Sequence, residues 1–124
     1  MFRVENIESP RSGRPVANQF EVIMDTAVGH VVLFQSYKTP IAMTVSHNVH
    51  GVLYYIATDK KYSMTTSKYQ KIFYEKQGKH ITQQYSVSNF SEWIEALHSS
   101  ALFNSLVLKE RENREGASTK CIEK

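Results

Sequence analysis

The chain has 124 residues, a hydrophobic fraction of 41% and a formal net charge of +3. This length supports one domain with a modest core, and no apolar run approaches the roughly 20 residues that span a bilayer. The single cysteine, Cys121, excludes an internal disulfide framework and a zinc site built from several cysteines. With no signal-peptide pattern at the N-terminus, we expect a soluble cytoplasmic protein.

The first half of the chain predicts strands. Residues 1–17 are polar and contain Pro10 and Pro15, which indicates an extended arm that leads into the domain. Residues 18–57 then show period-two alternation, as in Phe20, Val22 and Met24. The runs are separated by short connections, including a hairpin loop over residues 46–51. We therefore expect an antiparallel sheet of about four strands in residues 18–57.

The second half predicts helices. Tyr69, Ile72 and Phe73 recur at helical spacing, with Ser63 or Thr65 as candidate cap and Gly78 as candidate end, so a helix is expected near 65–77. Residues 81–87 are a candidate further short strand. One or two helices are expected in residues 89–110. Their apolar residues at helical spacing form a stripe that consists of Phe90, Trp93, Ile94 and Leu97. This stripe either belongs to the core or forms a protein-binding face.

The fold class expected from these elements is α+β. The sheet would carry the helix near 65–77 and the C-terminal helices in one domain, residues 1–110. Residues 111–124 are charged and predict a disordered tail.

The sequence contains no recognisable set of catalytic residues. His47 and His50 are the one close histidine pair, but zinc needs three or four ligands, and the pair falls in a predicted solvated turn. Cys121 has no neighbouring base in its polar tail. We therefore expect no enzymatic activity, no metal and no cofactor.

The basic charge is concentrated in the middle of the chain. Residues 38–80 hold seven lysines against Asp59 and Glu75. A helix N-terminus in this region could hold an anion, although capping and solvation explain the same residue types. The candidate binding residues are Lys60, Lys61, Tyr62, Thr65, Thr66, Ser67, Lys68, Tyr69 and Lys71.

Three sequence blocks carry a resemblance. They read SGRPVANQF from Ser12, FQSYxTxIA from Phe34 and YSxTTSKYxxxF from Tyr62, and together they cover roughly residues 12–75. The pattern resembles a small domain of unknown function found in bacteriophages, prophages and conjugative elements. The loop at residues 46–51 is longer than that family's usual turn, and residues after 80 lie outside the resemblance.

The resemblance implies an accessory gene product of a phage or mobile element. Such a product would bind a host or defence-system protein without catalysis, for example as an anti-defence inhibitor. The alternative is a nucleic-acid-binding module that uses the basic region 54–79, with stacking by Tyr54, Tyr55, Tyr62, Tyr69 and Tyr74. Lack of arginine in this region counts against that alternative. No membrane partner is expected, and the composition leaves the oligomeric state open.

Overall fold

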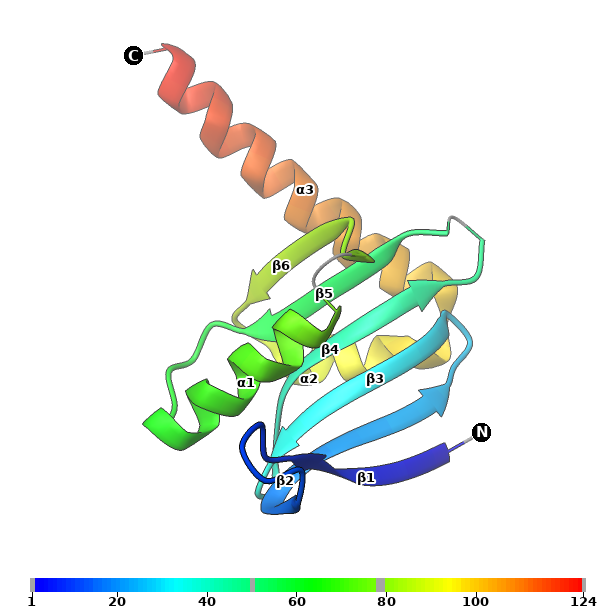
Figure 1. Cartoon of the computed structure of the whole chain (residues 1–124). Helices are drawn as coiled ribbons and strands as arrows, with labels where there is room; N and C mark the ends of the chain where they lie inside the picture. The colour runs from blue at the N-terminus through cyan, green and yellow to red at the C-terminus, as the bar shows by residue number, and fades with distance from the viewer. Residues whose placement is uncertain (1, 50, 78–79, 124) are drawn as a thin grey trace.

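A six-stranded sheet forms the centre of the molecule, and helices cover both of its faces (Figure 1). The computed structural model describes residues 2–49, 51–77 and 80–123, with side chains described as far as residue 113. The strands are β1 (Phe2–Glu8), β2 (Pro15–Asp25), β3 (Gly29–Ser36), β4 (Thr39–His47), β5 (Leu53–Thr58) and β6 (Gln83–Val87). The helices are α1 (Met64–Gln77), α2 (Phe90–Glu95), the short 3₁₀-helix η2 (Ala96–His98) and α3 (Ser100–Glu123).

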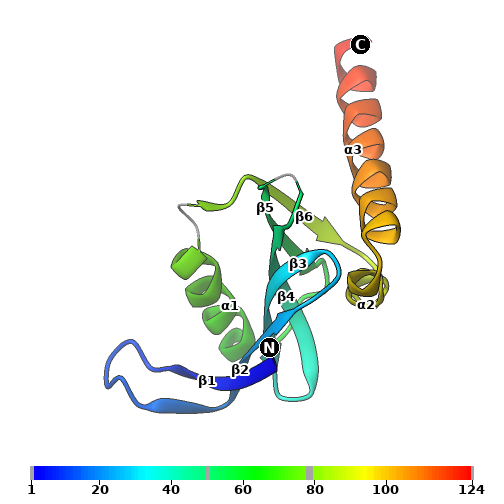
Figure 2. The ribbon, with the colours of Figure 1, turned by 90° about the vertical axis from the view of Figure 1, so that its right-hand side faces the viewer.

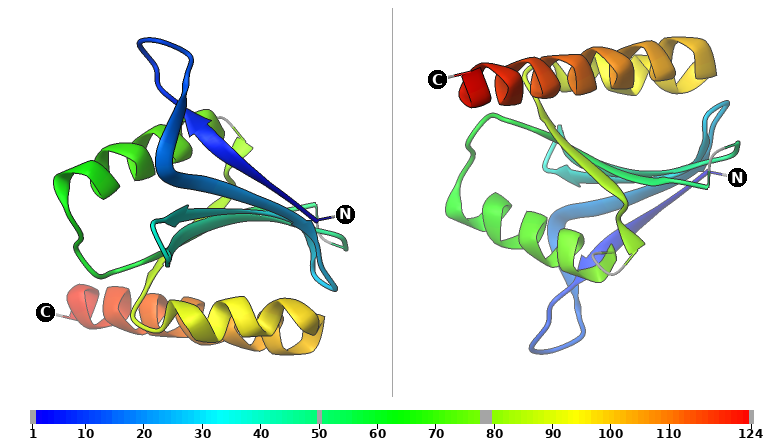
Figure 3. Two further views of the ribbon diagram at one scale, coloured as in Figure 1. Left: turned by 90° about the horizontal axis from the view of Figure 1, so that it is seen from below. Right: turned by 90° about the horizontal axis from the view of Figure 1, so that it is seen from above.

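The strands lie in the sheet in their chain order. Neighbours from β1 to β5 are antiparallel, as expected for strands joined by short loops. β6 is parallel to β5, and α1 forms the crossover between them. Figures 2 and 3 show α1 on one face of the sheet and α2 with α3 on the other, so the molecule has three layers.

The predicted α+β class is confirmed, and the sheet is larger than predicted. The four expected strands correspond to β2–β5, β6 lies in the candidate further strand of residues 81–87, and β1 adds a strand at the opposite edge. β1 lies within the segment expected to be an extended arm, residues 1–17. The helix expected near 65–77 is α1, and its candidate end, Gly78, lies outside the described residues.

The C-terminal helices α2 and α3 occupy the region where one or two helices were expected. α3 runs as far as Glu123, beyond residue 110 and through the segment predicted to be a disordered tail. None of the described helices is both long and apolar enough to cross a membrane.

Each face of the sheet buries its own hydrophobic cluster. Beneath α1, the rings of Phe34 and Phe73 stack with centroids 5.8 Å apart. Beneath α2 and α3, Trp93 and Phe103 meet edge to face at 5.7 Å. Burial of each such side chain contributes roughly 1.5–3 kcal/mol. The stripe that begins at Phe90 therefore belongs mainly to the core, with Ile94 half-buried at its margin.

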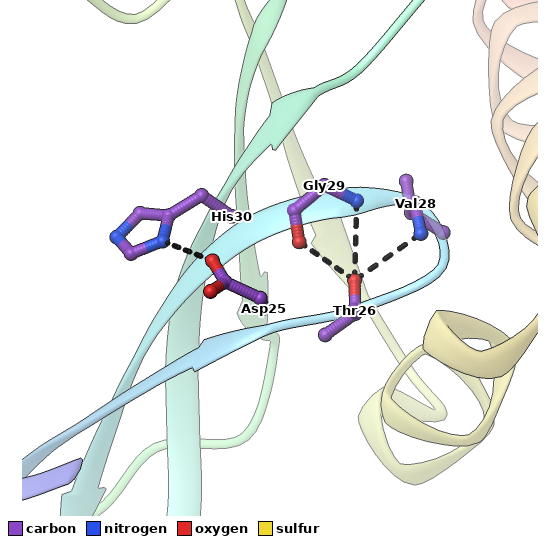
Figure 4. A network of polar contacts seen from close by, with 5 residues as sticks. All are labelled: Asp25, Thr26, Val28, Gly29 and His30. Atoms are coloured by element: carbon purple, nitrogen blue, oxygen red, sulfur yellow. Dashed lines mark hydrogen bonds and ion pairs between the residues drawn. The ribbon is translucent and has the colours of Figure 1, made fainter. Parts of the chain in front are cut away.

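Polar contacts within the turn between β2 and β3 connect its residues to one another (Figure 4). The Thr26 hydroxyl donates to the Gly29 carbonyl at 2.8 Å and accepts from the Val28 and Gly29 amides, each at 3.2 Å. His30 Nδ1 lies 2.9 Å from Asp25 Oδ1, and this hydrogen bond holds the pKa of the Asp25 carboxyl below its usual value. The turn thus has little freedom to move.

Gly29 has no room for a side chain. A Cβ there would stand 1.9 Å from the Ser46 carbonyl oxygen. We expect Gly29→Ala to lower the free energy of unfolding by at least about 2 kcal/mol, because the backbone itself must shift. Urea unfolding measures the change.

The matched control is Gly13→Asn. Gly13 has a φ of +69° and nothing within 4 Å of an added Cβ, and asparagine tolerates this left-handed conformation. Its effect should stay within about 0.5 kcal/mol. Equal unfolding midpoints for the two variants would contradict the close approach at Gly29.

Candidate functional site

α1 begins at a serine cap. The Ser63 hydroxyl accepts a hydrogen bond from the Thr66 amide at 3.2 Å, and the Ser67 amide donates to the Ser63 carbonyl at 3.0 Å. This geometry is typical of an N-cap residue. Of the two predicted caps, Ser63 holds the role, and Thr65 is exposed on the first turn.

A chain of hydroxyl groups ties the start of α1 to the sheet. Ser63 Oγ donates to Thr66 Oγ1 at 3.2 Å, and Thr66 Oγ1 lies 2.9 Å from Ser36 Oγ at the end of β3. The Thr66 and Ser36 hydroxyls each have one proton and two acceptor lone pairs, so the hydrogen bond between them can run in either direction. Thr66 and Ser36 are both buried, so this contact forms inside the domain and positions the helix.

Ser36 leads directly into an unusual turn. Tyr37 has a φ of 56°, its amide donates to the Asn18 carbonyl at 2.6 Å, and its carbonyl accepts from Gln35 Nε2 at 2.9 Å. Left-handed conformations are rare for bulky residues and cost of order 1–3 kcal/mol. The turn nevertheless presents the Tyr37 side chain to solvent, 55% exposed.

Gln19 lies beneath this turn with an unsatisfied amide. It pairs with Ser36 across β2 and β3 and is only 1% exposed. Neither its Nε2 nor its Oε1 has a hydrogen-bond partner among the described residues. Such burial costs about 1–3 kcal/mol, so Gln19 weakens the fold locally while filling the space beside the hydroxyl chain.

The predicted binding residues divide into a solvent-facing group and a buried group. Lys60, Lys61, Thr65, Ser67, Lys68 and Lys71 are exposed, as is Tyr62. Lys68 Nζ lies 5.3 Å from the centre of the Tyr69 ring, and Lys71 Nζ lies 4.0 Å from Glu75 Oε1. Thr66 and Tyr69 are buried and support the surface from below.

Two exposed residues were missed by the sequence reasoning. Met64, the first residue of α1, is 90% exposed, and Tyr37, which is 55% exposed, lies in the turn between β3 and β4; neither was among the predicted binding residues. We define the α1 N-terminal surface as Tyr37, Lys38, Lys60, Lys61, Tyr62, Met64 and Lys68. The sequence does contain a signal for this turn. Tyr37 is followed by Lys38 and then by Thr39-Pro40, and proline is typical of the start of a strand.

Most of the tyrosines proposed to stack on bases are part of the core. Tyr54, Tyr55 and Tyr69 are buried, and burial raises the pKa of the Tyr54 and Tyr55 phenols. Tyr74 is half-buried and packs edge to face on Tyr55. The expectation of a five-tyrosine stacking surface is therefore wrong, because strand tyrosines here serve the cluster beneath α1 or that beneath α3.

A cavity of about 190 Å³ opens beside the α1 N-terminal surface. It lies at the carboxyl ends of β5 and β6, between Thr58, Lys60, Tyr62, Ser88 and Ile94. The chain leaves β5 toward one face of the sheet and β6 toward the other, and sites in open α/β sheets form at such a point. The cavity is smaller than a typical small-molecule pocket of about 300–1,000 Å³, so it suits a single side chain.

His47, the first histidine of the close pair, is not a solvated turn residue. His47 is buried, its Nδ1 accepts from the Val49 amide at 3.1 Å, and its Nε2 lies 3.2 Å from Asn104 Oδ1. The predicted solvated role is therefore wrong for His47, and His50 lies outside the described residues. Within the described part of the chain, no group of three His, Cys, Asp or Glu side chains could hold a metal ion.

Comparison with known proteins places this geometry in a family. A family model described as a family of unknown function, DUF8033, matches residues 3–89. The chain belongs to this family. The match contains β2 to β6, β1 apart from Phe2, α1 and the three resembling blocks, and it leaves α2, η2 and α3 outside. No curated protein and no solved structure matches the chain.

The cap at α1 can be tested by two adjacent substitutions. We expect Ser63→Ala to lower the free energy of unfolding by about 0.5–2 kcal/mol, because the Thr66 amide loses its acceptor. Thr65→Ala, at an exposed position, should change it by less than about 0.5 kcal/mol. Thermal melting would measure both, and a larger loss for Thr65→Ala would contradict the assignment of Ser63 as the cap.

The unsatisfied side-chain amide of Gln19 leads to a prediction about stability. We expect Gln19→Met to leave stability unchanged or to raise it by up to about 1–3 kcal/mol, because methionine fills similar space without buried polar atoms. The control is Gln70→Met, which removes the 3.3 Å bond from Gln70 Nε2 to Tyr55 Oη and should destabilise. If Gln19→Met were the more damaging change, the Gln19 amide would be a net stabilising group.

Proposed function

We propose that the protein acts without catalysis by binding another protein through the α1 N-terminal surface. The observation that carries this proposal is the exposure of Met64, at 90%, and of Tyr37, at 55%, at the two ends of the hydroxyl chain. The hydroxyl chain joins them, since Ser63 precedes Met64 and Ser36 precedes Tyr37. Methionine and tyrosine are enriched in protein interfaces, and their contact with water is relieved when a partner covers them.

The charge of the surface favours an acidic protein partner. Four exposed lysines lie close in the chain to these two residues: Lys38 follows Tyr37, and Lys60, Lys61 and Lys68 are within four residues of Met64. Asp59 is the nearby acid in the chain. Lysines at the rim of an interface steer partners and set salt dependence more than they set affinity. The adjacent cavity has room for one partner side chain.

The biological setting rests on the sequence resemblance. An accessory gene product of a phage or mobile element would present this surface to a host or defence-system protein, and an anti-defence inhibitor is the specific form we propose. A rigid, non-catalytic surface suits such a role, because inhibition needs only a competing contact.

Nucleic-acid binding is the second candidate. Tyr62 next to Lys60 and Lys61, and Tyr37 next to Lys38, supply exposed rings beside positive charge. The candidate is weakened by the burial of the other tyrosines and by the lack of arginine in residues 38–80. Its binding would fall steeply with salt.

Site-specific photo-crosslinking can separate these functions. A benzophenone amino acid in place of Met64 should capture one discrete protein in the expressing cell. The same group in place of Val49, which is exposed in the loop after β4, should capture none. Lys60→Gln with Lys68→Gln should reduce the Met64 crosslink several-fold, because rim charges assist association, whereas Lys109→Gln on α3 should not.

Three outcomes decide against protein binding at this surface. A crosslink that disappears with nuclease would support the nucleic-acid candidate. Equal capture from positions 64 and 49 would mean that the α1 N-terminal surface has no special role. Reproducible turnover of a substrate by the purified protein would show that the function is enzymatic.

A further inference from the structure

The outer edge of the sheet at β1 carries an unused pairing surface. β1 is the first strand of the sheet order, so β2 is its only sheet neighbour within the described residues. Its residues Phe2 to Asn6 are all exposed, with Phe2 at 71% and Val4 at 52%. Figure 1 shows the strand along the outer side of the sheet, with neither helix layer over its free edge.

Residues 2–6 of this edge contain no proline and no bulge, and their two charged side chains, Arg3 and Glu5, are of opposite sign. β1 contains no proline, glycine or lysine, and it pairs with β2 in regular register from Phe2 to Asn6 before the irregularity at Glu8. Edge strands of monomeric proteins are commonly protected by charges, prolines or bulges. A regular, exposed edge with apolar side chains is therefore available for a further strand.

The sequence of β1 is complementary to itself in the antiparallel direction. If a second copy pairs about a two-fold axis at Val4, Arg3 lies opposite Glu5 of the other copy and Glu5 lies opposite its Arg3. Val4 then faces Val4, with Phe2 diagonal to it. Opposite charges and apolar pairs stabilise directly facing positions, and like charges destabilise them.

We propose that two copies of this protein associate through β1 and form one continuous sheet across the two domains. Within each chain, Arg3 Nε already lies 3.0 Å from Glu5 Oε1. In the pair, both Arg3 and both Glu5 side chains form one cluster of alternating charge. Phe2 and Val4 of both copies line the opposite side of the seam, where their apolar surface is covered.

Because the strand is short, we expect the affinity between the two copies to be low. Five facing residues bury less area than a standard interface of about 1,600 Å². We expect a dimer in reversible exchange with monomer, with a dissociation constant in the micromolar to millimolar range. This association is independent of the proposed partner binding, because it uses no residue of the α1 N-terminal surface.

Charge reversal at the two facing positions tests the register. Arg3→Glu places Glu opposite Glu5, and Glu5→Arg places Arg opposite Arg3, so each variant alone should associate roughly tenfold or more weakly than the parent. Mixing the two variants should restore association, because every facing pair is again of opposite charge. The double variant with both changes should also restore it. Sedimentation equilibrium across the micromolar to millimolar range measures the parent, the two single variants, their mixture and the double variant.

Thermal melting checks that the variants keep the fold. Because exposed ion pairs contribute only about 0–1 kcal/mol, the charge reversals should leave the melting of each monomer nearly unchanged. Restored association in both the mixture and the double variant would support the β1 register. A monomeric parent at every concentration would overturn the proposal. So would a parent dimer that neither single variant weakens, because the copies would then meet through another surface.

Discussion

The buried contact between Ser36 and Thr66 is the constraint on which the layout of the α1 face depends. It fixes the start of a helix against the end of a strand, and the cap of that helix is part of the same chain of hydroxyls. Three sequence blocks that are far apart in the chain meet here, with Gln19 facing Ser36 and Ser36 bonded to Thr66. The shared sequence pattern therefore describes an internal junction, and the lysines around it are displayed by that junction.

The sequence predicted those elements that depend mainly on interactions between residues close together in the chain. The strands in residues 18–57, the helix near 65–77 and the cap at Ser63 follow from periodicity and capping, which depend on neighbours in the chain. β1 was expected to be part of an extended arm because residues 1–17 are polar and contain Pro10 and Pro15, and within β1 itself only Ile7 is buried. The wrong roles for His47 and the strand tyrosines have another cause, since amphipathic side chains suit core and surface alike and only tertiary contacts choose.

The exposed and buried parts of the candidate site have different physical tasks. Tyr37 is held in a costly backbone conformation by Asn18 and Gln35, and Gln19 below it lacks hydrogen-bond partners among the described residues. Both are unfavourable for stability, and the two large clusters on the faces of the sheet offset them. Unfavourable local features that persist in a well-packed domain often mark functional positions, which agrees with a partner surface at the start of α1.

The crossover through α1 also has a consequence for the order of assembly. β2 to β5 join through short loops, so their contacts close small stretches of chain and are kinetically favoured. β6 can add to the sheet only after the longer segment through α1 has been closed, which costs more chain entropy. We expect α1 and β6 to be acquired late and to open first in native-state hydrogen exchange. A protease or a chaperone would therefore meet a nascent meander before the completed junction exists.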